Sequence, residues 1–69
     1  MSLRQIEYKQ LKKRIKNNDT LKNKIESINL RVDLKTTAIT DIEFSGKSRK
    51  TFKGVHCNGK NISKWLAKQ

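Results

Sequence analysis

The sequence predicts an α+β fold: one or two amphipathic helices over residues 3–28, a small antiparallel sheet of three strands over residues 28–55, and a short helix over residues 61–69. Three observations predict it. Apolar residues recur every three or four positions in the first segment, alternate with polar residues in the second, and return to helical spacing near the C-terminus. Because the chain has only 69 residues, we expect residues 1–69 to form one small domain.

The first segment predicts an amphipathic helix, since its apolar residues fall on one broad face at 100° per residue. Residues 17–20, Asn-Asn-Asp-Thr, have poor helix propensity, and Asp19 could cap a second helix, so one long helix and a helical hairpin both stay open. The apolar face is broader than a three-stranded sheet covers easily, so we also expect a homodimer through this segment. The residues of this face are Leu3, Ile6, Tyr8, Leu11, Ile15, Leu21, Ile25 and Ile28.

Alternation begins at Ile28 and predicts the three strands. A first strand over 28–35 would place Ile28, Leu30, Val32 and Leu34 on one face, and a second would do so for Ala38, Thr40, Ile42 and Phe44. Residues 45–48, Ser-Gly-Lys-Ser, predict a turn with a basic tip. The third strand, over 50–55, returns with Phe52 facing the same core as Phe44.

The last segment predicts a helix with an apolar face that needs the sheet. Asn58-Gly59 is a strong turn signal, and Asn61 is a good N-cap residue. Ile62, Trp65 and Leu66 follow at helical spacing. We therefore expect Trp65 to be a core residue rather than a platform for a nucleic-acid base.

The inventory of reactive side chains argues against an enzyme. The chain has one His, one Cys and six scattered acids, and it lacks a glycine-rich phosphate loop. His56 and Cys57 are adjacent, so they supply two ligands where structural zinc needs four. Asp41 and Glu43 lie on one face of a strand, which is typical of a solvated surface. We expect no metal and no cofactor, and we expect Cys57 to be a small, semi-buried residue.

Two further expectations concern location. No apolar run is long enough to span a membrane, and the first residues lack the apolar core of a signal peptide. The sequence thus predicts a cytoplasmic protein without a membrane partner, associated with the nucleoid if it binds DNA.

Charge is the most informative feature. The chain has 17 Lys and Arg against 6 Asp and Glu, a net charge of +11, and residues 46–69 contain basic residues and no acid. This pattern predicts a nucleic-acid-binding protein, and a DNA-binding regulator in particular, because the aromatic cluster of RNA-binding sheets is missing. The alternatives are an RNA-binding protein, a protein-interaction module such as an inhibitor or adaptor that binds an acidic partner, and a membrane-surface helix.

The turn chemistry assigns two groups of contacts. Gly54 and Gly59 bracket a segment in which the backbone can approach a groove, and Asn58 tolerates a left-handed conformation. Lys60 would then enter a narrow AT-rich minor groove, whose potential attracts a cation. Phosphate contacts would come from the basic residues of the hairpin tip and their neighbours. The candidate nucleic-acid-binding residues are Lys47, Arg49, Lys50, Lys53, Gly54, Asn58, Gly59, Lys60 and Lys64.

Residues 46–69 also resemble a known family. The stretches Gly46-Lys47-Ser48-Arg49-Lys50-Thr51-Phe52-Lys53-Gly54, Asn58-Gly59-Lys60 and Ile62-Ser63-Lys64-Trp65-Leu66-Ala67 resemble the C-terminal DNA-binding domain of the H-NS and MvaT nucleoid proteins. The resemblance implies a loop that reads AT-rich minor grooves, matched by Lys53, Gly54, Asn58, Gly59 and Lys60. It implies phosphate contacts by Lys47, Arg49, Lys50 and Lys64.

A second resemblance concerns two shorter stretches. Phe52-Lys53-Gly54-Val55 and Lys64-Trp65-Leu66-Ala67 are similar to stretches of the APETALA-type DNA-binding domains found in some homing endonucleases. It implies the same class of function, DNA binding.

Overall fold

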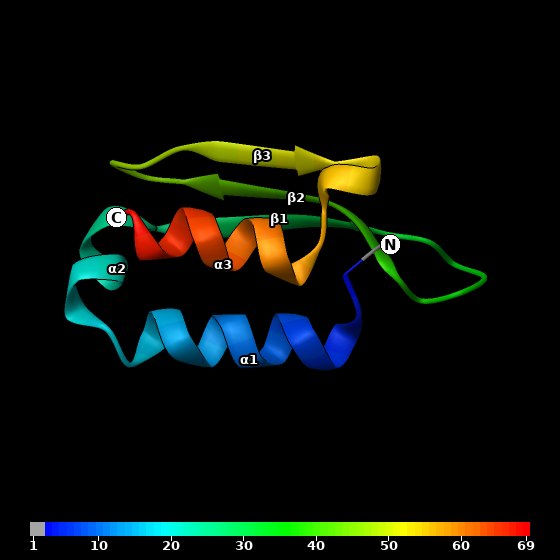
Figure 1. Ribbon diagram of the computed structural model, residues 1–69, viewed down its shortest axis with the longest axis horizontal. Helices are drawn as coiled ribbons and strands as arrows, with labels where there is room; N and C mark the ends of the chain where they lie inside the picture. The colour runs from blue at the N-terminus through cyan, green and yellow to red at the C-terminus, as the bar shows by residue number, and fades with distance from the viewer. Residues whose placement is uncertain (1–2) are drawn as a thin grey trace.

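The computed structural model describes residues 3–69; residues 1 and 2, which the expected domain included, lie outside the described part (Figure 1). The α+β class is confirmed: two N-terminal helices precede a three-stranded antiparallel sheet and a C-terminal helix, and α3 lies between the sheet and α1. The elements are α1 (Gln5–Lys16), α2 (Asp19–Lys24), β1 (Ser27–Val32), β2 (Ile39–Ser45), β3 (Lys50–Lys53), the 3₁₀-helix η1 (Gly54–His56) and α3 (Gly59–Ala67).

The N-terminal segment is a helical hairpin, so the second of the two open alternatives is correct. The break lies at Asn17 and Asn18, and the side chain of Asn18 caps α2 by accepting a hydrogen bond from the Leu21 amide at 3.2 Å. Asn18 thus takes the role that was expected of Asp19. The helical segment is also shorter than 3–28, because α2 ends at Lys24 and Leu3 pairs as a β-bridge with Ile39.

The strands follow the order β1-β2-β3, but two of them end earlier than expected. β1 stops at Val32 because the Asp33 carboxylate accepts hydrogen bonds from the following backbone amides and closes a turn. Leu34, expected on the apolar face of a strand, is therefore 95% exposed. β3 stops at Lys53, since Gly54 turns the chain into η1 with φ +56°.

The inner face of β2 also differs from the expected alternation. Ile42 and Phe44 are buried as predicted, but the third buried residue is Ile39 instead of Thr40 or Ala38. The pairing with β1 shifts between Arg31 and Val32. Such a bulge adds one residue to a strand and reverses the side to which the residues beyond it point. Strict alternation was therefore wrong at this end of β2.

The core centres on aromatic rings from the sheet and α3. Phe44 and Phe52 face each other as expected, with ring centroids 6.2 Å apart and edge-to-face. The Trp65 ring stacks on Phe44 at 4.9 Å and meets Phe52 edge-on at 6.2 Å. Offset and edge-to-face ring pairs add to the stability that burial provides. The predicted core role of Trp65 is confirmed in that its ring packs against this cluster.

The apolar face of the N-terminal helices is largely covered within one chain. Leu11, Ile15, Leu21 and Ile25 are buried in the core, whereas Ile6 is 60% exposed. The apolar surplus that led to the expectation of a homodimer is therefore smaller than the sequence indicated.

The start of α3 also differs from expectation. Asn58, not Asn61, is the N-cap, and its side-chain oxygen accepts from the Asn61 amide at 2.9 Å. Asn58 has φ −140°, an extended conformation rather than the left-handed one expected of it. α3 consequently begins at Gly59, two residues before the predicted position.

Candidate nucleic-acid interface

A basic groove of about 570 Å³ lies between β3 and α3. We call it the β3–α3 groove. None of its lining residues, all within the described chain, is acidic. They are Lys50, Thr51, Phe52, Lys53, His56, Asn61, Lys64, Trp65 and Lys68.

The two walls follow from the periods of the elements that form them. Positions 61, 64 and 65 of α3 and its C-cap residue, Lys68, lie at helical spacing, so they form one stripe along the helix. On β3, Phe52 points into the core, and the Lys50 ammonium lies 5.6 Å from the centre of the Phe52 ring. This distance is within the range of a cation–π contact, which holds Lys50 at the groove.

The floor of the groove is aromatic. Trp65 is half-buried: one face of its ring stacks on Phe44, and the side chain still lines the groove together with Phe52. Such a floor offers apolar surface to a ligand that lies between the cationic walls. The groove thus combines cations on its walls with an apolar base.

The predicted hairpin tip lies at one end of this groove. The Ser48 hydroxyl donates a hydrogen bond to the Gln69 side-chain oxygen at 2.8 Å, which joins the tip to the C-terminal end of α3. The tip is also docked on the α2–β1 junction, because the Ser48 amide donates to the Lys24 carbonyl at 3.0 Å. Lys47 and Arg49 are exposed on this docked tip.

The predicted minor-groove segment lies at the other end of β3. Both ends of the Asn58 side-chain amide make contacts within the chain, since its NH₂ group donates to the Val55 carbonyl at 3.0 Å and its oxygen caps α3. Gly59 is half-buried against α1. Lys60 is exposed but lies outside the β3–α3 groove, in a depression shared with Arg14 and Ser63. The segment is therefore a 3₁₀ turn and a helix cap, not a projecting loop.

Of the candidate residues, Lys50, Lys53 and Lys64 meet in the groove, and Lys68 joins them although it was not among the candidates. The spacing of four residues between Lys64 and Lys68 on a predicted helix was the signal that could have found it. Thr51, His56 and Asn61 were also missed. They became part of a site only when η1 and α3 folded back against β3.

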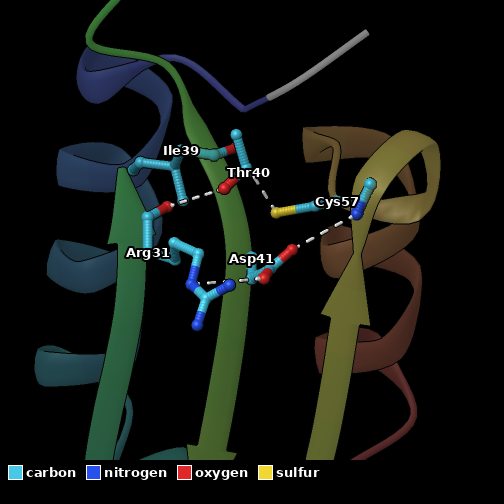
Figure 2. A network of polar contacts seen from close by, with 6 residues as sticks. Arg31, Ile39, Thr40, Asp41 and Cys57 are labelled. Atoms are coloured by element: carbon cyan, nitrogen blue, oxygen red, sulfur yellow. Dashed lines mark hydrogen bonds and ion pairs between the residues drawn. The ribbon is translucent and has the colours of Figure 1, made fainter. Parts of the chain in front are cut away.

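The acids of β2, Asp41 and Glu43, are engaged in contacts within the sheet, as Figure 2 shows for Asp41. Its carboxylate lies 3.9 Å from Arg31 Nε and accepts a hydrogen bond from the Gly54 amide at 3.4 Å. Glu43 accepts from the Asn29 side chain at 3.4 Å. In the register of the sheet, Asp41 lies opposite Arg31 on β1 and Lys53 on β3. Asp41 therefore fixes the position of η1 at the end of the groove.

Cys57 lies next to this network, and its surroundings are those of a thiol with low reactivity. Its side chain is fully buried, and its thiol donates to the Ile39 carbonyl at 3.7 Å. Burial raises the pKa of the Cys57 thiol, and the negative charge of Asp41 raises it further, against a smaller opposing effect of the backbone at Leu3. A thiol of this kind remains protonated at neutral pH.

Residues 3–69 contain no cluster of three or more His, Cys, Asp or Glu side chains that could hold a metal ion. In the same part of the chain, no helix has the length and apolar character required to cross a membrane. Comparison with protein families, with curated proteins and with solved structures finds no match for this chain.

Proposed function

We propose that this protein binds double-stranded DNA by placing one sugar-phosphate backbone along the β3–α3 groove. The observation that carries the proposal is the lining of the groove, which has four lysines and no acid around an aromatic floor. Lysines neutralise phosphates and release condensed counterions, which supplies most of the free energy of non-specific binding.

The dimensions of the two walls support backbone contact. Lys50 and Lys53 are about 10 Å apart along β3, and because they are three residues apart they leave the strand on opposite faces, Lys50 on the side of Phe52 and Lys53 on the side of Asp41. Lys64 on α3 and Lys68 at its C-cap are one turn apart, about 6 Å along the helix axis. Lys50, Lys64 and Lys68, with Lys53 at the outer edge of the groove, can contact phosphates of one strand, while the other strand of the duplex faces solvent.

A second basic surface lies on α1, where Lys9, Lys12, Lys13 and Lys16 gather. It is lined by residues of α1 and by Asn17, with no aromatic side chain among them. The β3–α3 groove adds an aromatic floor and polar groups from Thr51, His56 and Asn61, which can position a backbone by hydrogen bonds. We therefore assign the phosphate contacts to the groove.

The salt dependence of DNA binding tests this assignment. Replacing Lys50, Lys53, Lys64 and Lys68 with glutamine should reduce the slope of log K against log salt by about 3 to 4, because each lost phosphate contact removes about one unit. The matched control replaces the four lysines of α1 with glutamine, which removes the same charge. We expect the control to change the slope by about one unit or less.

The same measurement separates the alternatives. If the two variants have equal salt slopes, the β3–α3 groove does not contact the phosphates. If the affinity of the wild type does not change with salt, the protein does not bind nucleic acid through its charges. A hairpin RNA and a single DNA strand of matched sequence serve as competing ligands. If the protein binds the RNA or the single strand more tightly than the duplex, that nucleic acid is its ligand instead of duplex DNA. If it binds none of the three, an acidic protein partner is favoured.

A further inference from the structure

A second groove, of about 610 Å³, lies between the N-terminal helices and the start of β1. We call it the α1–β1 groove. Its floor is apolar and its rim is basic, and among its described lining residues only Glu26 is acidic. It is lined by Tyr8, Lys12, Ile15, Lys16, Lys22, Ile25, Glu26, Ser27 and Ile28.

The apolar floor continues along β1, where the inner face of the sheet is incompletely covered. Leu30 is 36% exposed, and Ile28 and Val32 are half-buried. Their partners on β2, namely Phe44, Ile42 and Ile39, are all buried. The helix α3 packs its Trp65 over Phe44 and Phe52, away from β1, so the apolar residues of β1 have fewer neighbours than those of β2.

β1 is also the edge strand of the sheet, next to β2 alone among the strands of residues 3–69. An edge strand presents backbone N–H and C=O groups that can pair with an added strand. It carries no proline, which is one of the devices that block such pairing. The apolar floor and the open backbone edge therefore lie along the same element.

The rim determines the charge of a suitable occupant. Lys12 and Lys16 come from α1 and Lys22 from α2, and the Lys12 ammonium lies 6.0 Å from the centre of the Tyr8 ring. Three cations around an apolar floor complement a segment that carries both carboxylates and apolar side chains.

We propose that the α1–β1 groove binds an acidic, extended segment of a partner protein. The main chain of the segment runs beside β1, its apolar side chains cover Tyr8 and Ile28, and its carboxylates pair with the lysines of the rim. The inference is independent of DNA binding, since this groove shares no residue with the β3–α3 groove.

Charge argues against a second copy of the chain as the occupant. Each copy has a net charge of +11 and would bring the same lysines to the interface. A nucleic acid fits less well too, because it has no peptide backbone to pair with the open edge of β1. An acidic peptide segment satisfies both the rim and the floor.

Selection from a displayed library of random dodecapeptides, with the full chain immobilised, tests the proposal. We expect the selected peptides to be rich in Asp and Glu alternating with apolar residues. Charge reversal by Lys12→Glu with Lys16→Glu should weaken their binding by about tenfold or more, because two complementary pairs become repulsive. The matched control, Lys9→Glu with Lys13→Glu, makes the same change of charge on the same helix outside the groove and should change binding by less than about threefold.

Two further readouts complete the test. Tyr8→Ser should weaken peptide binding by removing part of the floor. Circular dichroism verifies that this variant is folded. If it is not folded, the comparison of the two double variants tests the proposal by itself. No selected peptide, peptides without acidic residues, or equal losses for the two double variants would overturn the proposal. A dimer observed by sedimentation would also overturn it if Lys12→Glu with Lys16→Glu makes that dimer dissociate, since a second copy of the chain would then occupy the groove.

Discussion

The carboxylate of Glu7 occupies the space into which a side chain at Gly59 would project: Glu7 Oε2 lies 2.8 Å from the ideal Cβ position of Gly59. The other carboxylate oxygen accepts hydrogen bonds from the Arg4 amide and from Arg4 Nε, each at 3.1 Å. One side chain thus completes the N-terminal cap of α1 and meets the first residue of α3. A carboxylate at this place also complements the positive end of the α3 dipole.

The first prediction follows from this contact. Gly59→Ala should lower the free energy of unfolding by about 1 kcal/mol, because the new methyl group must displace Glu7 from the cap. In a Glu7→Ala background the same substitution should be neutral or stabilising, since alanine is the better helix former. Urea denaturation of the four proteins gives the coupling energy, and additive effects would contradict the contact.

Glu7 also predicts a dependence on acid. Its pKa is lowered, first by the hydrogen bond from the Arg4 backbone and then by that from the Arg4 side chain. The folded state therefore binds this proton less readily than the unfolded chain does. Its stabilising contribution is present above the ordinary glutamate pKa of about 4.3 and is lost as the pH falls through the lower, folded value. Glu7→Gln should reduce the acid dependence of unfolding in this range, and an unchanged profile would contradict the prediction.

Gly46 is predicted to tolerate substitution far less than Gly54. Gly46 has φ +135°, and a Cβ there would lie 2.5 Å from the Lys24 carbonyl oxygen and 2.8 Å from the Glu26 amide nitrogen, both backbone atoms. Gly46→Ala should therefore lower the free energy of unfolding by more than about 2 kcal/mol. Gly54 has φ +56° with nothing within 4 Å of its Cβ position, so Gly54→Ala should cost only about 1 to 2 kcal/mol from backbone strain. Thermal unfolding ranks the two variants, and the reverse order would contradict the docked hairpin tip.

The periodicity of the sequence predicted the α+β class and the core pair Phe44 and Phe52, because burial selects residues on one face of each element. It could not place the break in alternation between Arg31 and Val32, since a bulge depends on pairing between strands and not on the local pattern. It placed the α3 cap at Asn61, but Asn58 takes that role. Both residues are asparagines, which cap equally well, so the local sequence does not choose between them.

The candidate site, too, was predicted from the sequence only in part. The acid-free C-terminal block was evident from the charges, and Lys50, Lys53 and Lys64 were taken from it. The groove itself required β3 and α3 to lie side by side, which brings His56 and Lys68 to the same surface. Such tertiary proximity carries no signal in the spacing of a single sequence.

Cys57 is predicted to be unreactive in the folded protein. Its thiol is buried and its pKa is raised, first by that burial and then by Asp41. Alkylation by iodoacetamide at neutral pH should proceed far more slowly than in the urea-unfolded chain, because the reagent needs an exposed thiolate. Comparable rates in the two states would contradict the burial of Cys57.

The raised pKa of Cys57 also sets an alkaline limit. The folded state holds the thiol proton more tightly than the unfolded chain, so the stabilising contribution of Cys57 is fully present below the ordinary thiol pKa of about 8.5 and declines as the pH rises above it. Cys57→Ala should lower stability at neutral pH through a lost contact and flatten this alkaline decline. Urea denaturation at several pH values measures both effects, and an unchanged slope in the variant would exclude Cys57 as the cause.

The last prediction concerns Lys60, which the sequence placed in an AT-rich minor groove. In the structure Lys60 belongs to the first turn of α3 and shares its depression with Arg14 and Glu7, so it does not project from a loop tip. Insertion into a narrow groove needs a side chain that extends beyond its surroundings. We therefore expect Lys60→Ala to weaken AT-rich and GC-rich duplexes by the same small factor, about twofold or less. Lys53→Ala, which removes a cation from the β3–α3 groove, should weaken both duplexes more strongly and lower the salt slope by about one unit. Fluorescence anisotropy measures the affinities of the wild type and of both variants for the two matched duplexes. If Lys60→Ala instead reduces the preference for the AT-rich duplex, Lys60 contacts the minor groove as the sequence predicted. The contacts of the β3–α3 groove with the DNA backbone would then be only part of the interface.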